Sequence, residues 1–378
     1  MTTKYKADKL FFWIVMSLVI IGLIFFTSAS LGVLAINPEK FRGILFTQYV
    51  LGFLGGLLAM YIGYKIPYIY FRRYALILFL ITLGLTALTI IPGIGVARGG
   101  GSRWLSILGF SFQPVELLKI GFIMYFASWL STLKNRVKNP LYSILPLIIS
   151  LGLVAFILIK QPDTKNIILL AITAFTMLFV SGTPIKYILG LVGLLGVVFV
   201  ALIYMPNSNF GYIKDRINTF IHPNTDVLGD SWQIKQSEYA IGSGGIWGKG
   251  LGQSLQKFKY LPEPQGDSIF AVIGEELGFL GTTLIICLYL VFALRGFRIS
   301  TRNAPDSFSK LLVIGFITII TAQSFMNIAA ITGIMPLTGV PLVFISHGGT
   351  ALFLSMGMMG IVLNISRYQG KPRLAKRA

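Results

Sequence analysis

Long apolar runs separated by short polar segments limit what this chain can fold into. A helix needs roughly 20 apolar residues to cross a bilayer. Ten runs approach or exceed that length, at residues 10–36, 44–64, 74–93, 113–131, 141–159, 166–182, 184–205, 268–294, 311–335 and 340–366. Only 12% of the residues are charged, whereas a soluble domain usually has about 25%. The pattern excludes a soluble protein and predicts one all-α polytopic membrane domain, 1–378, with about ten transmembrane helices.

The distribution of basic residues predicts how these helices are oriented. Lysine and arginine number 32 against 13 acidic residues, which gives a formal net charge of +19. With the N-terminus in the cytoplasm, most of the cations fall in cytoplasmic segments, including the basic tail 367–378. This asymmetry follows the positive-inside rule and predicts that both termini are cytoplasmic. Topology therefore accounts for the charge, and we expect no nucleic-acid partner.

The same orientation predicts one large extracytoplasmic loop, 206–266, and places most acidic residues on the outer side. The loop contains the glycine-rich run GSGGIWGKG. This run does not fit a phosphate-binding P-loop, because Ser243 replaces the first glycine of that motif and Gly250 follows the lysine. We expect the glycines to form tight backbone turns over a cavity. Any chemistry is expected on the outer face.

Asp267 stands where this loop meets the eighth apolar run, and Glu275 and Glu276 follow inside the run. Carboxylates are costly to bury at a membrane boundary, so they are candidate functional residues. On an ideal helix, Gly274 and Gly278 share the face of Asp267, which predicts a close approach by a neighbouring helix. The alternative is that Asp267 only caps its helix. The pattern leaves both interpretations open.

A second group of polar residues precedes and opens the fourth apolar run. Gln113, Glu116 and Lys119 follow one another at spacings of three. Glu116 and Lys119 could form a simple ion pair, although that alone does not explain their presence in a membrane helix. Arg103, in the preceding outer loop with the flexible glycines 99–101, suits either a lipid headgroup site or an interfacial belt. Together these residues predict a cationic outer cavity.

Three further features are ambiguous in the sequence. Asp163 lies between Lys160 and Lys165 in a short outer loop, where a solvated turn and a functional acid are both open. A modestly polar stripe near the end of the ninth run indicates contacts between helices; it comprises Gln323, Ser324, Asn327 and Thr332. Prolines and glycines interrupt 336–349, which predicts a broken or re-entrant segment that lines a cavity.

Metal and disulfide chemistry have little support in the sequence. The single cysteine, Cys287, and two separated histidines, His222 and His347, provide neither a disulfide framework nor a zinc-ligand cluster. No cofactor is required by these residues. A divalent cation held by Asp267 is left open.

Several stretches together resemble the SEDS family, named for shape, elongation, division and sporulation. They run in order along most of the chain: GSRWLSILGFSFQPVELLK at 101–119, QPD at 161–163, DRINTF to KYLPEP at 215–264, DSIFAVIGEELGFLG at 267–281 and TGVPLVFISHGG at 338–349. The sequences of the long loop and of the GEELG stretch are more similar to division members of the family than to elongation members.

This resemblance implies a peptidoglycan glycosyltransferase that polymerises lipid II at the outer face of the bacterial plasma membrane, in cell division. It implies a class B penicillin-binding protein and other divisome membrane proteins as partners. The family's catalytic aspartate corresponds to Asp267, which would be the general base. Basic residues would stabilise the diphosphate leaving group. The implied substrate-binding residues are Arg103, Glu116, Lys119, Lys257 and Ser346.

The chain departs from the family pattern beside these residues. Around the aspartate it reads Gln265, Gly266 and Ser268 where HTDF is common, Val343 replaces a usual proline, and His347 replaces a usual tyrosine. These departures concern neighbouring contacts and not the reaction class.

Other functions remain open at this level. A flippase for lipid-linked precursors is one, since charged cavities also mark transport pathways. A non-enzymatic division scaffold and an elongation-type polymerase are the others.

Overall fold

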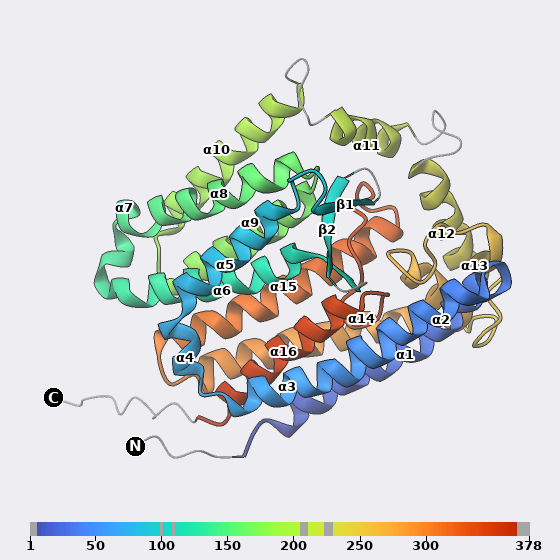
Figure 1. The fold of residues 1–378 in the computed structure, drawn as a ribbon, viewed down its shortest axis with the longest axis horizontal. Coiled ribbons are helices and arrows are strands. Elements are labelled where there is room, and N and C mark those ends of the chain that lie inside the picture. The colour runs from blue at the N-terminus through green and yellow to red at the C-terminus, as the bar shows by residue number, and fades with distance from the viewer. Residues whose placement is uncertain (1–5, 99–100, 108–109, 205–210, 223–229, 369–378) are drawn as a thin grey trace.

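The computed structural model describes residues 6–98, 101–107, 110–204, 211–222 and 230–368. Long helices lie side by side along one direction (Figure 1). The two ends of the described chain meet at one end of the bundle, where the Asp8 amide donates to Ser366 Oγ at 3.0 Å and Arg295 pairs with Asp8 at 2.8 Å. This arrangement agrees with an even number of membrane crossings.

Within the described residues, eight helical segments are long and apolar enough to cross a membrane. They are Lys9–Ile36 (α1), Pro38–Lys65 (α2, Pro38–Phe46; η1, Thr47–Leu54; α3, Gly55–Lys65), Pro114–Leu133 (α6), Pro140–Lys160 (α7, Pro140–Ser143; α8, Leu145–Lys160), Thr164–Ser181 (α9), Ile269–Arg302 (α14), Ser307–Ile331 (α15) and Gly349–Ser366 (α16). The protein is thus a multi-pass membrane protein, as predicted.

Two further apolar helices, α5 (Ala75–Leu88) and α10 (Ile185–Tyr204), occupy the other two predicted runs. The apolar part of each is shorter than the eight spans, so the count of ten crossings stays a prediction. Short elements α4 (Tyr68–Arg73) and η2 (Lys134–Lys138) connect helices at the end of the bundle where the termini meet. α15 and α16 are the most enclosed spans, because most of their residues are buried by other helices.

The segment between α5 and α6, a predicted outer loop, is more ordered than the sequence predicts. It forms a three-stranded antiparallel sheet of β1 (Gly95–Arg98), β2 (Gly101–Ile107) and β3 (Phe110–Phe112). Ser102 and Trp104 of β2 face Ala97 and Val96 of β1 across the hairpin. Of the glycines expected to make this loop flexible, Gly101 belongs to β2, and 99–100 lie outside the described residues. This small sheet is an addition to the predicted helical fold, because the loop was expected only to be flexible.

The predicted large loop contains three helices, α11 (Gly211–Ile221), α12 (Asp230–Gly244) and α13 (Gln256–Lys259); residues 206–210 and 223–229 of the prediction lie outside the described part. Its glycine-rich turn docks on α14. Gly245, Gly248, Gly250 and Gly252 all have positive φ, a conformation that glycine adopts at low cost. The prediction of tight glycine turns is confirmed.

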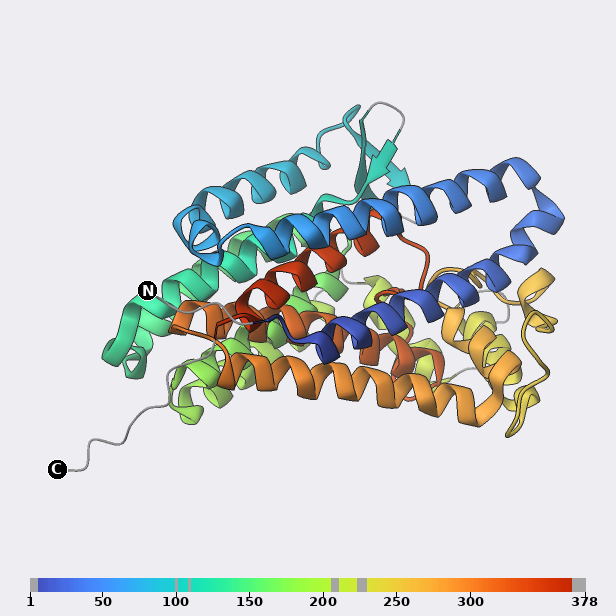
Figure 2. The ribbon, with the colours of Figure 1, turned by 90° about the horizontal axis from the view of Figure 1, so that it is seen from below.

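α14 is interrupted where this turn reaches it. Gly278 has φ 65° and ψ −160°, which is not helical, and α14 bends near the loop (Figure 2). The loop replaces the helical hydrogen bonds lost there. Phe279 and Leu280 donate to the carbonyls of 245 and 246, while the carbonyls of Glu275 and Glu276 accept from the amides of 249 and 250, at 2.9–3.2 Å. All four backbone groups remain paired, which a buried chain requires.

The predicted glycine face of α14 therefore packs differently than expected. Gly274 contacts Gly244 of α12 so closely that a methyl group on Gly244 would lie 2.0 Å from the Gly274 carbonyl oxygen. The close approach is confirmed, but the neighbour is an outer-loop helix. At Gly278 the prediction of a continuous helix was wrong, because this glycine breaks the helix.

Residues 332–348 between α15 and α16 contain no helix, so the predicted break in this segment is confirmed. Gln48 of η1, which is fully buried, holds the segment in place. Its amide donates to the Ser346 carbonyl at 3.3 Å and its carbonyl accepts from the Gly348 amide at 3.0 Å. The segment therefore has a fixed path through the protein interior.

Candidate active site

Asp267 lies in the turn immediately before α14, but it does not cap the helix. The N-cap position belongs to Ser268. Asp267 Oδ1 instead accepts a hydrogen bond from Gln233 Nε2 of α12 at 3.1 Å, and the same amide nitrogen donates to Ser268 Oγ at 2.8 Å. The capping interpretation was therefore wrong, and the Asp267 carboxylate is bound by α12 instead.

The backbone at Asp267 is held by α15. Asn327 Nδ2 donates to the Asp267 carbonyl at 2.7 Å and to the Val340 carbonyl at 2.8 Å. Asn327 is 1% exposed, so its amide has no solvent alternative. This one side chain joins the start of α14 to the broken segment after α15.

Lys165, in the first turn of α9, reaches the same place. Its ammonium donates to the Gly339 carbonyl. A methyl group on Gly339 would lie 3.6 Å from Asp267 Oδ2 and 3.8 Å from Lys165 Nζ, so both charged groups face the same side of this glycine. The carboxylate and the ammonium thus approach the same glycine of the broken segment, one from the start of α14 and the other from α9.

The protonation of Asp267 reflects this environment. Burial raises the pKa of its carboxyl from 3.8 to about 6, while the nearby Lys165 ammonium and the Gln233 hydrogen bond act in the opposite direction. Glu263 adds to the increase through charge repulsion. A carboxylate with a pKa close to neutral is suited to accept a proton near physiological pH.

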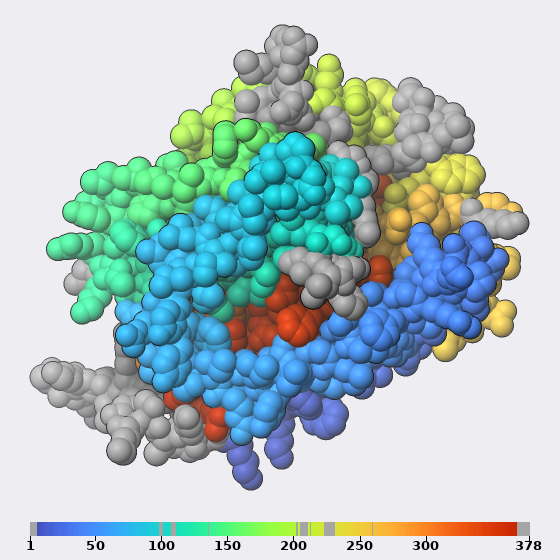
Figure 3. Space-filling model, viewed as in Figure 1, coloured from blue at the N-terminus to red at the C-terminus, as the bar shows by residue number. Residues whose placement is uncertain are grey.

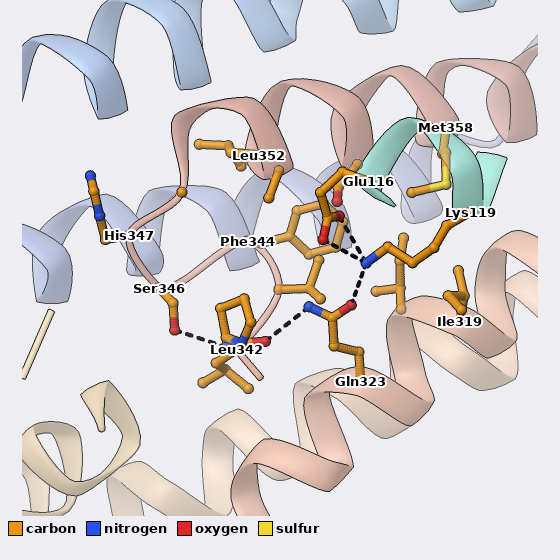
Figure 4. Close-up of a pocket in the computed structure, with 16 residues that line it drawn as sticks. Glu116, Lys119, Ile319, Gln323, Leu342, Phe344, Ser346, His347, Leu352 and Met358 are labelled. Atoms are coloured by element: carbon orange, nitrogen blue, oxygen red, sulfur yellow. Dashed lines mark hydrogen bonds and ion pairs between the residues drawn. The ribbon is translucent and has the colours of Figure 1, made fainter. Parts of the chain in front are cut away.

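A second polar cluster lines a pocket between α6, α15 and the broken segment (Figure 4). Lys119 Nζ contacts a Glu116 carboxylate oxygen at 2.8 Å and Gln323 Oε1 at 2.9 Å. Gln323 Nε2 donates to the Pro341 carbonyl at 3.2 Å. The predicted residue Ser346 also lines this pocket, and its hydroxyl accepts from the Leu342 amide at 2.8 Å.

α15 connects the two clusters. Gln323, in the pocket, and Asn327, at Asp267, are one helical turn apart, or roughly 6 Å along the axis. The Pro341 carbonyl accepts from the Gln323 amide, and the Val340 carbonyl accepts from the Asn327 amide. Part of the polar stripe predicted on this helix therefore aligns the broken segment with both clusters.

Arg103 is engaged with the protein backbone. Its Nε donates to the Gln161 carbonyl at 2.8 Å and its Nη2 to the Pro162 carbonyl at 2.6 Å. The Gln161 amide in turn donates to the Thr86 carbonyl of α5 and to Oγ1 of Thr89, the C-cap residue of that helix, both at 2.8 Å. Arg103 thus fixes the turn that leads into α9 and Lys165.

Lys257 is placed differently from the expectation that it binds substrate. It is 2% exposed, and its ammonium contacts Glu276 at 2.7 Å, Ser28 Oγ at 2.9 Å and the Gly252 carbonyl at 2.8 Å. Because an ammonium has three N–H donors, none remains for a substrate in this arrangement. Lys257 joins the loop to α1 and α14.

Glu275 and Glu276, which the sequence marks as candidate functional acids, hold the same loop. Glu275 accepts from Lys249 Nζ at 2.8 Å and from Ser254 Oγ at 2.5 Å. Both glutamates are fully buried. Of the three carboxylates in this region, only Asp267 is partly exposed and outside an ion pair of this loop.

Asp163 is buried, 1% exposed, so the solvated-turn interpretation was wrong. Asn166 Nδ2 donates to it at 2.8 Å. The sequence analysis also missed Lys165 and Gln233 as neighbours of Asp267. For Lys165 the signal in the sequence is its position shortly after Asp163, at the start of an apolar run.

The described residues offer little support for a metal ion. No group of three or more histidine, cysteine, aspartate or glutamate side chains converges within them. A lysine ammonium also lies beside Asp267. The site therefore differs from the clusters of several oxygen ligands that usually hold a divalent cation.

With this geometry established, comparison with known proteins gives a consistent result. Residues 8–371 match the family model FTSW_RODA_SPOVE, described as cell cycle protein. The chain is 40% identical over 375 residues to stage V sporulation protein E of Bacillus subtilis, covering 97% of this chain and 99% of that protein. It is 37% identical over 362 residues to a probable peptidoglycan glycosyltransferase FtsW of Trichlorobacter lovleyi, covering 95% and 93%.

Solved structures share the fold. A chain from a study titled "Structural coordination of polymerization and crosslinking by a peptidoglycan synthase complex" superposes with a TM-score of 0.77 at 24% identity, covering 96% of this chain and 98% of that one. The crystal structure of Thermus thermophilus rod shape determining protein RodA gives a TM-score of 0.69 at 24% identity, covering 96% and 98%.

Proposed function

The chain belongs to the cell cycle protein family of FtsW, RodA and SpoVE, the SEDS family that its motifs resemble, and we propose that it is a peptidoglycan glycosyltransferase. Relatives of 37% identity carry that activity in their names. The proposed reaction polymerises lipid II into glycan strands at the outer face of the plasma membrane.

The observation that carries this proposal is the setting of Asp267. Its carboxylate stands outside the ion pairs of the loop and accepts from Gln233, while Asn327 holds its backbone carbonyl. A pKa of about 6 leaves it ionised at neutral pH while it can still accept a proton. In the proposed step, a sugar hydroxyl oxygen attacks the anomeric carbon of a second lipid-linked sugar. The hydroxyl proton passes to Asp267, and the bond from the anomeric carbon to the diphosphate breaks.

The leaving diphosphate needs positive charge nearby. Lys119 is the best placed of the predicted cations, because it lines a pocket together with Glu116, Gln323 and Ser346 (Figure 4). We propose that its ammonium exchanges part of its contact with Glu116 for a phosphate oxygen as charge develops, which is electrostatic stabilisation of the transition state. Arg103 then acts by holding the 161–163 turn, and Lys257 by holding the outer loop.

The polyprenyl chains of such a substrate require an apolar path. A pocket between η1, α3 and α16 is lined by Val50, Leu51, Gly55, Gly349, Thr350 and Phe353. In the space-filling view, one face is hollowed beside the blue helices, and red atoms from the C-terminal part of the chain form the floor (Figure 3). We propose that a lipid tail lies along this apolar surface while its headgroup reaches the polar clusters.

We propose septal cell-wall synthesis as the biological role, with a class B penicillin-binding protein as the cross-linking partner and with other divisome proteins. The structural similarity to a chain of a peptidoglycan synthase complex supports such a partner. The similarity to a sporulation protein supports a second role of the same chemistry, at a sporulation septum.

Product length from lipid II tests the proposal. The purified protein is incubated with lipid II, with and without a class B penicillin-binding protein, and wild type is compared with Asp267→Asn. We expect long glycan chains from wild type and none from the variant. Glu263→Gln, a change of an exposed carboxylate four residues away, is the matched control and should still make chains.

Two outcomes count against the proposal. Chains of normal length from a folded Asp267→Asn protein would exclude Asp267 as the base. If wild type makes no chains even with its partner, movement of lipid II across liposome membranes becomes the next measurement, and its detection would replace the polymerase with a flippase.

A further inference from the structure

Lys165 occupies a position that the proposed reaction does not explain. Its side chain runs from the first turn of α9 into the protein, and its ammonium donates to the Gly339 carbonyl beside the Asp267 carboxylate. Charged lysine ammonium groups are rarely buried without a paired acid. Lys160, at the end of α8, is exposed, so a lysine in this part of the chain can face the solvent. The inward path of Lys165 therefore requires a reason.

We propose that Lys165 is a positioning residue for Asp267, whose ammonium, anchored on Gly339, holds the Asp267 carboxylate charged and in place for proton transfer. This inference rests on the proposed function, because it assigns Lys165 a role in the same site.

The turn that carries Lys165 is fixed from two sides. Arg103 of β2 holds the carbonyls of Gln161 and Pro162 at 2.8 and 2.6 Å. The Gln161 side chain anchors the turn to α5 through Thr86 and Thr89. The turn leads directly into the first residues of α9. The contacts that fix the turn therefore also fix the point from which the Lys165 side chain extends. Arg103 then contributes to the site through Lys165.

The acceptor is equally fixed. Gly339 has φ 61°, and the next residue, Val340, is held through its carbonyl by Asn327, which also holds the Asp267 backbone. The carbonyl that binds Lys165 and the chain that bears Asp267 are thus joined by one side chain. A shift of either charged group relative to the other would strain or break one of these hydrogen bonds.

Other charged groups face this pair and must be included. Asp163 in the preceding turn, Arg103 of β2 and Arg216 of α11 are the other charged neighbours of Lys165. Glu263 of the loop before α14 opposes the ionisation of Asp267. Lys165 is the cation whose charge favours the ionised form of Asp267 most strongly among these neighbours.

The direct test measures the ionisation of Asp267 without substrate. Infrared titration of the full-length protein follows the band of protonated carboxyl groups, and subtraction of an Asp267→Asn sample isolates Asp267. For Lys165→Met, the subtracted sample is the double variant with Asp267→Asn. In Lys165→Met we expect the midpoint of the Asp267 titration to move to higher pH by about one to three units, because a close opposite charge usually lowers a carboxyl pKa by that amount. Lys165→Arg should stay near wild type.

Lys160→Met is the matched control, because Lys160 is exposed and lies 4.7 Å from the Phe156 ring. Its midpoint should equal that of wild type. A midpoint in Lys165→Met within about 0.3 units of wild type, or an equal shift in both methionine variants, would overturn the proposal. If Lys165→Met does not fold, Lys165→Gln replaces it with the same expectations.

The pH dependence of lipid II polymerisation gives a second readout. The acid limb should move upward in Lys165→Met by the shift seen in the titration, and activity should recover at higher pH. A uniform loss of activity at all pH values would indicate only a structural role and would also overturn the proposal. If wild type has no polymerase activity, the titration still decides whether the pair exists, so the two failures are distinguishable.

Discussion

Replacing Asp267 by asparagine should abolish polymerisation and at the same time stabilise the protein. Asparagine resembles the neutral carboxyl group in size and retains an oxygen that can accept from Gln233. It removes only the charge that burial penalises. A residue that served mainly as a structural contact would behave in the opposite way.

The size of the effect follows from the pKa of Asp267. Folding raises it from 3.8 to about 6, a difference of about 2 units, and each unit corresponds to roughly 1.4 kcal/mol. The folded state therefore binds the proton more tightly than the unfolded state. The free energy of unfolding of wild type should fall as the pH rises from about 4 to about 6, in total by about 3 kcal/mol. Above that range, Asp267→Asn should be more stable than wild type by a similar amount.

Unfolding in mixed micelles, followed by tryptophan fluorescence at a series of pH values, measures this difference. The gain of Asp267→Asn should vanish below pH ~4 and reach its full size above pH ~6. Asp8→Asn is the control, since Asp8 pairs with Arg295 at 2.8 Å and its loss should not stabilise the protein. A variant Asp267→Asn that is less stable than wild type at pH 7.5, or a gain independent of pH, would refute the reasoning.

Four further results are expected. The acid limb of the wild-type pH–rate profile should have its midpoint near pH 6, since Asp267 must be ionised; a midpoint near 4 would contradict this. Lys119→Met should lower kcat/KM for lipid II by about 10²-fold, and near-normal turnover would exclude its role. Lys257→Met should destabilise the protein by about 3–5 kcal/mol because Glu276 loses its buried partner, and Lys257→Met with Glu276→Leu should recover most of that loss. Gly278→Ala should cost at least about 2 kcal/mol, since its methyl group would lie 2.4 Å from the Gly248 nitrogen, whereas Gly84→Ala, with open space around it, should be neutral or stabilising.

The membrane class and the position of most helices could be predicted from the sequence, because the need to bury about 20 apolar residues in a bilayer is a local property. Asp267, Glu116 and Lys119 could be singled out for the same reason, since polar groups stand out in apolar runs. The pairing of Glu116 with Lys119 follows from helical spacing and is present at 2.8 Å.

Contacts between distant segments could not be predicted in this way. Lys257 is close to Asp267 in sequence, yet its partners include Ser28, 229 residues away. Lys165 reaches Gly339 across 174 residues. The break at Gly278 also depends on a distant turn, because a helical pattern does not reveal that another segment supplies the missing hydrogen bonds. The hairpin of β1 and β2 was missed because glycine-rich segments give little periodic signal.

The break in α14 has a mechanical consequence. In the first part of that helix, 269–277, the carbonyls of Glu275 and Glu276 accept hydrogen bonds from the glycine-rich turn of the loop. The same part packs on α12 through Gly274. It is therefore supported by the loop as well as by the remainder of α14, while Asn327 of α15 holds the backbone at Asp267 just before it. A displacement of the 245–250 turn would therefore remove backbone hydrogen-bond partners from the helical segment that follows Asp267.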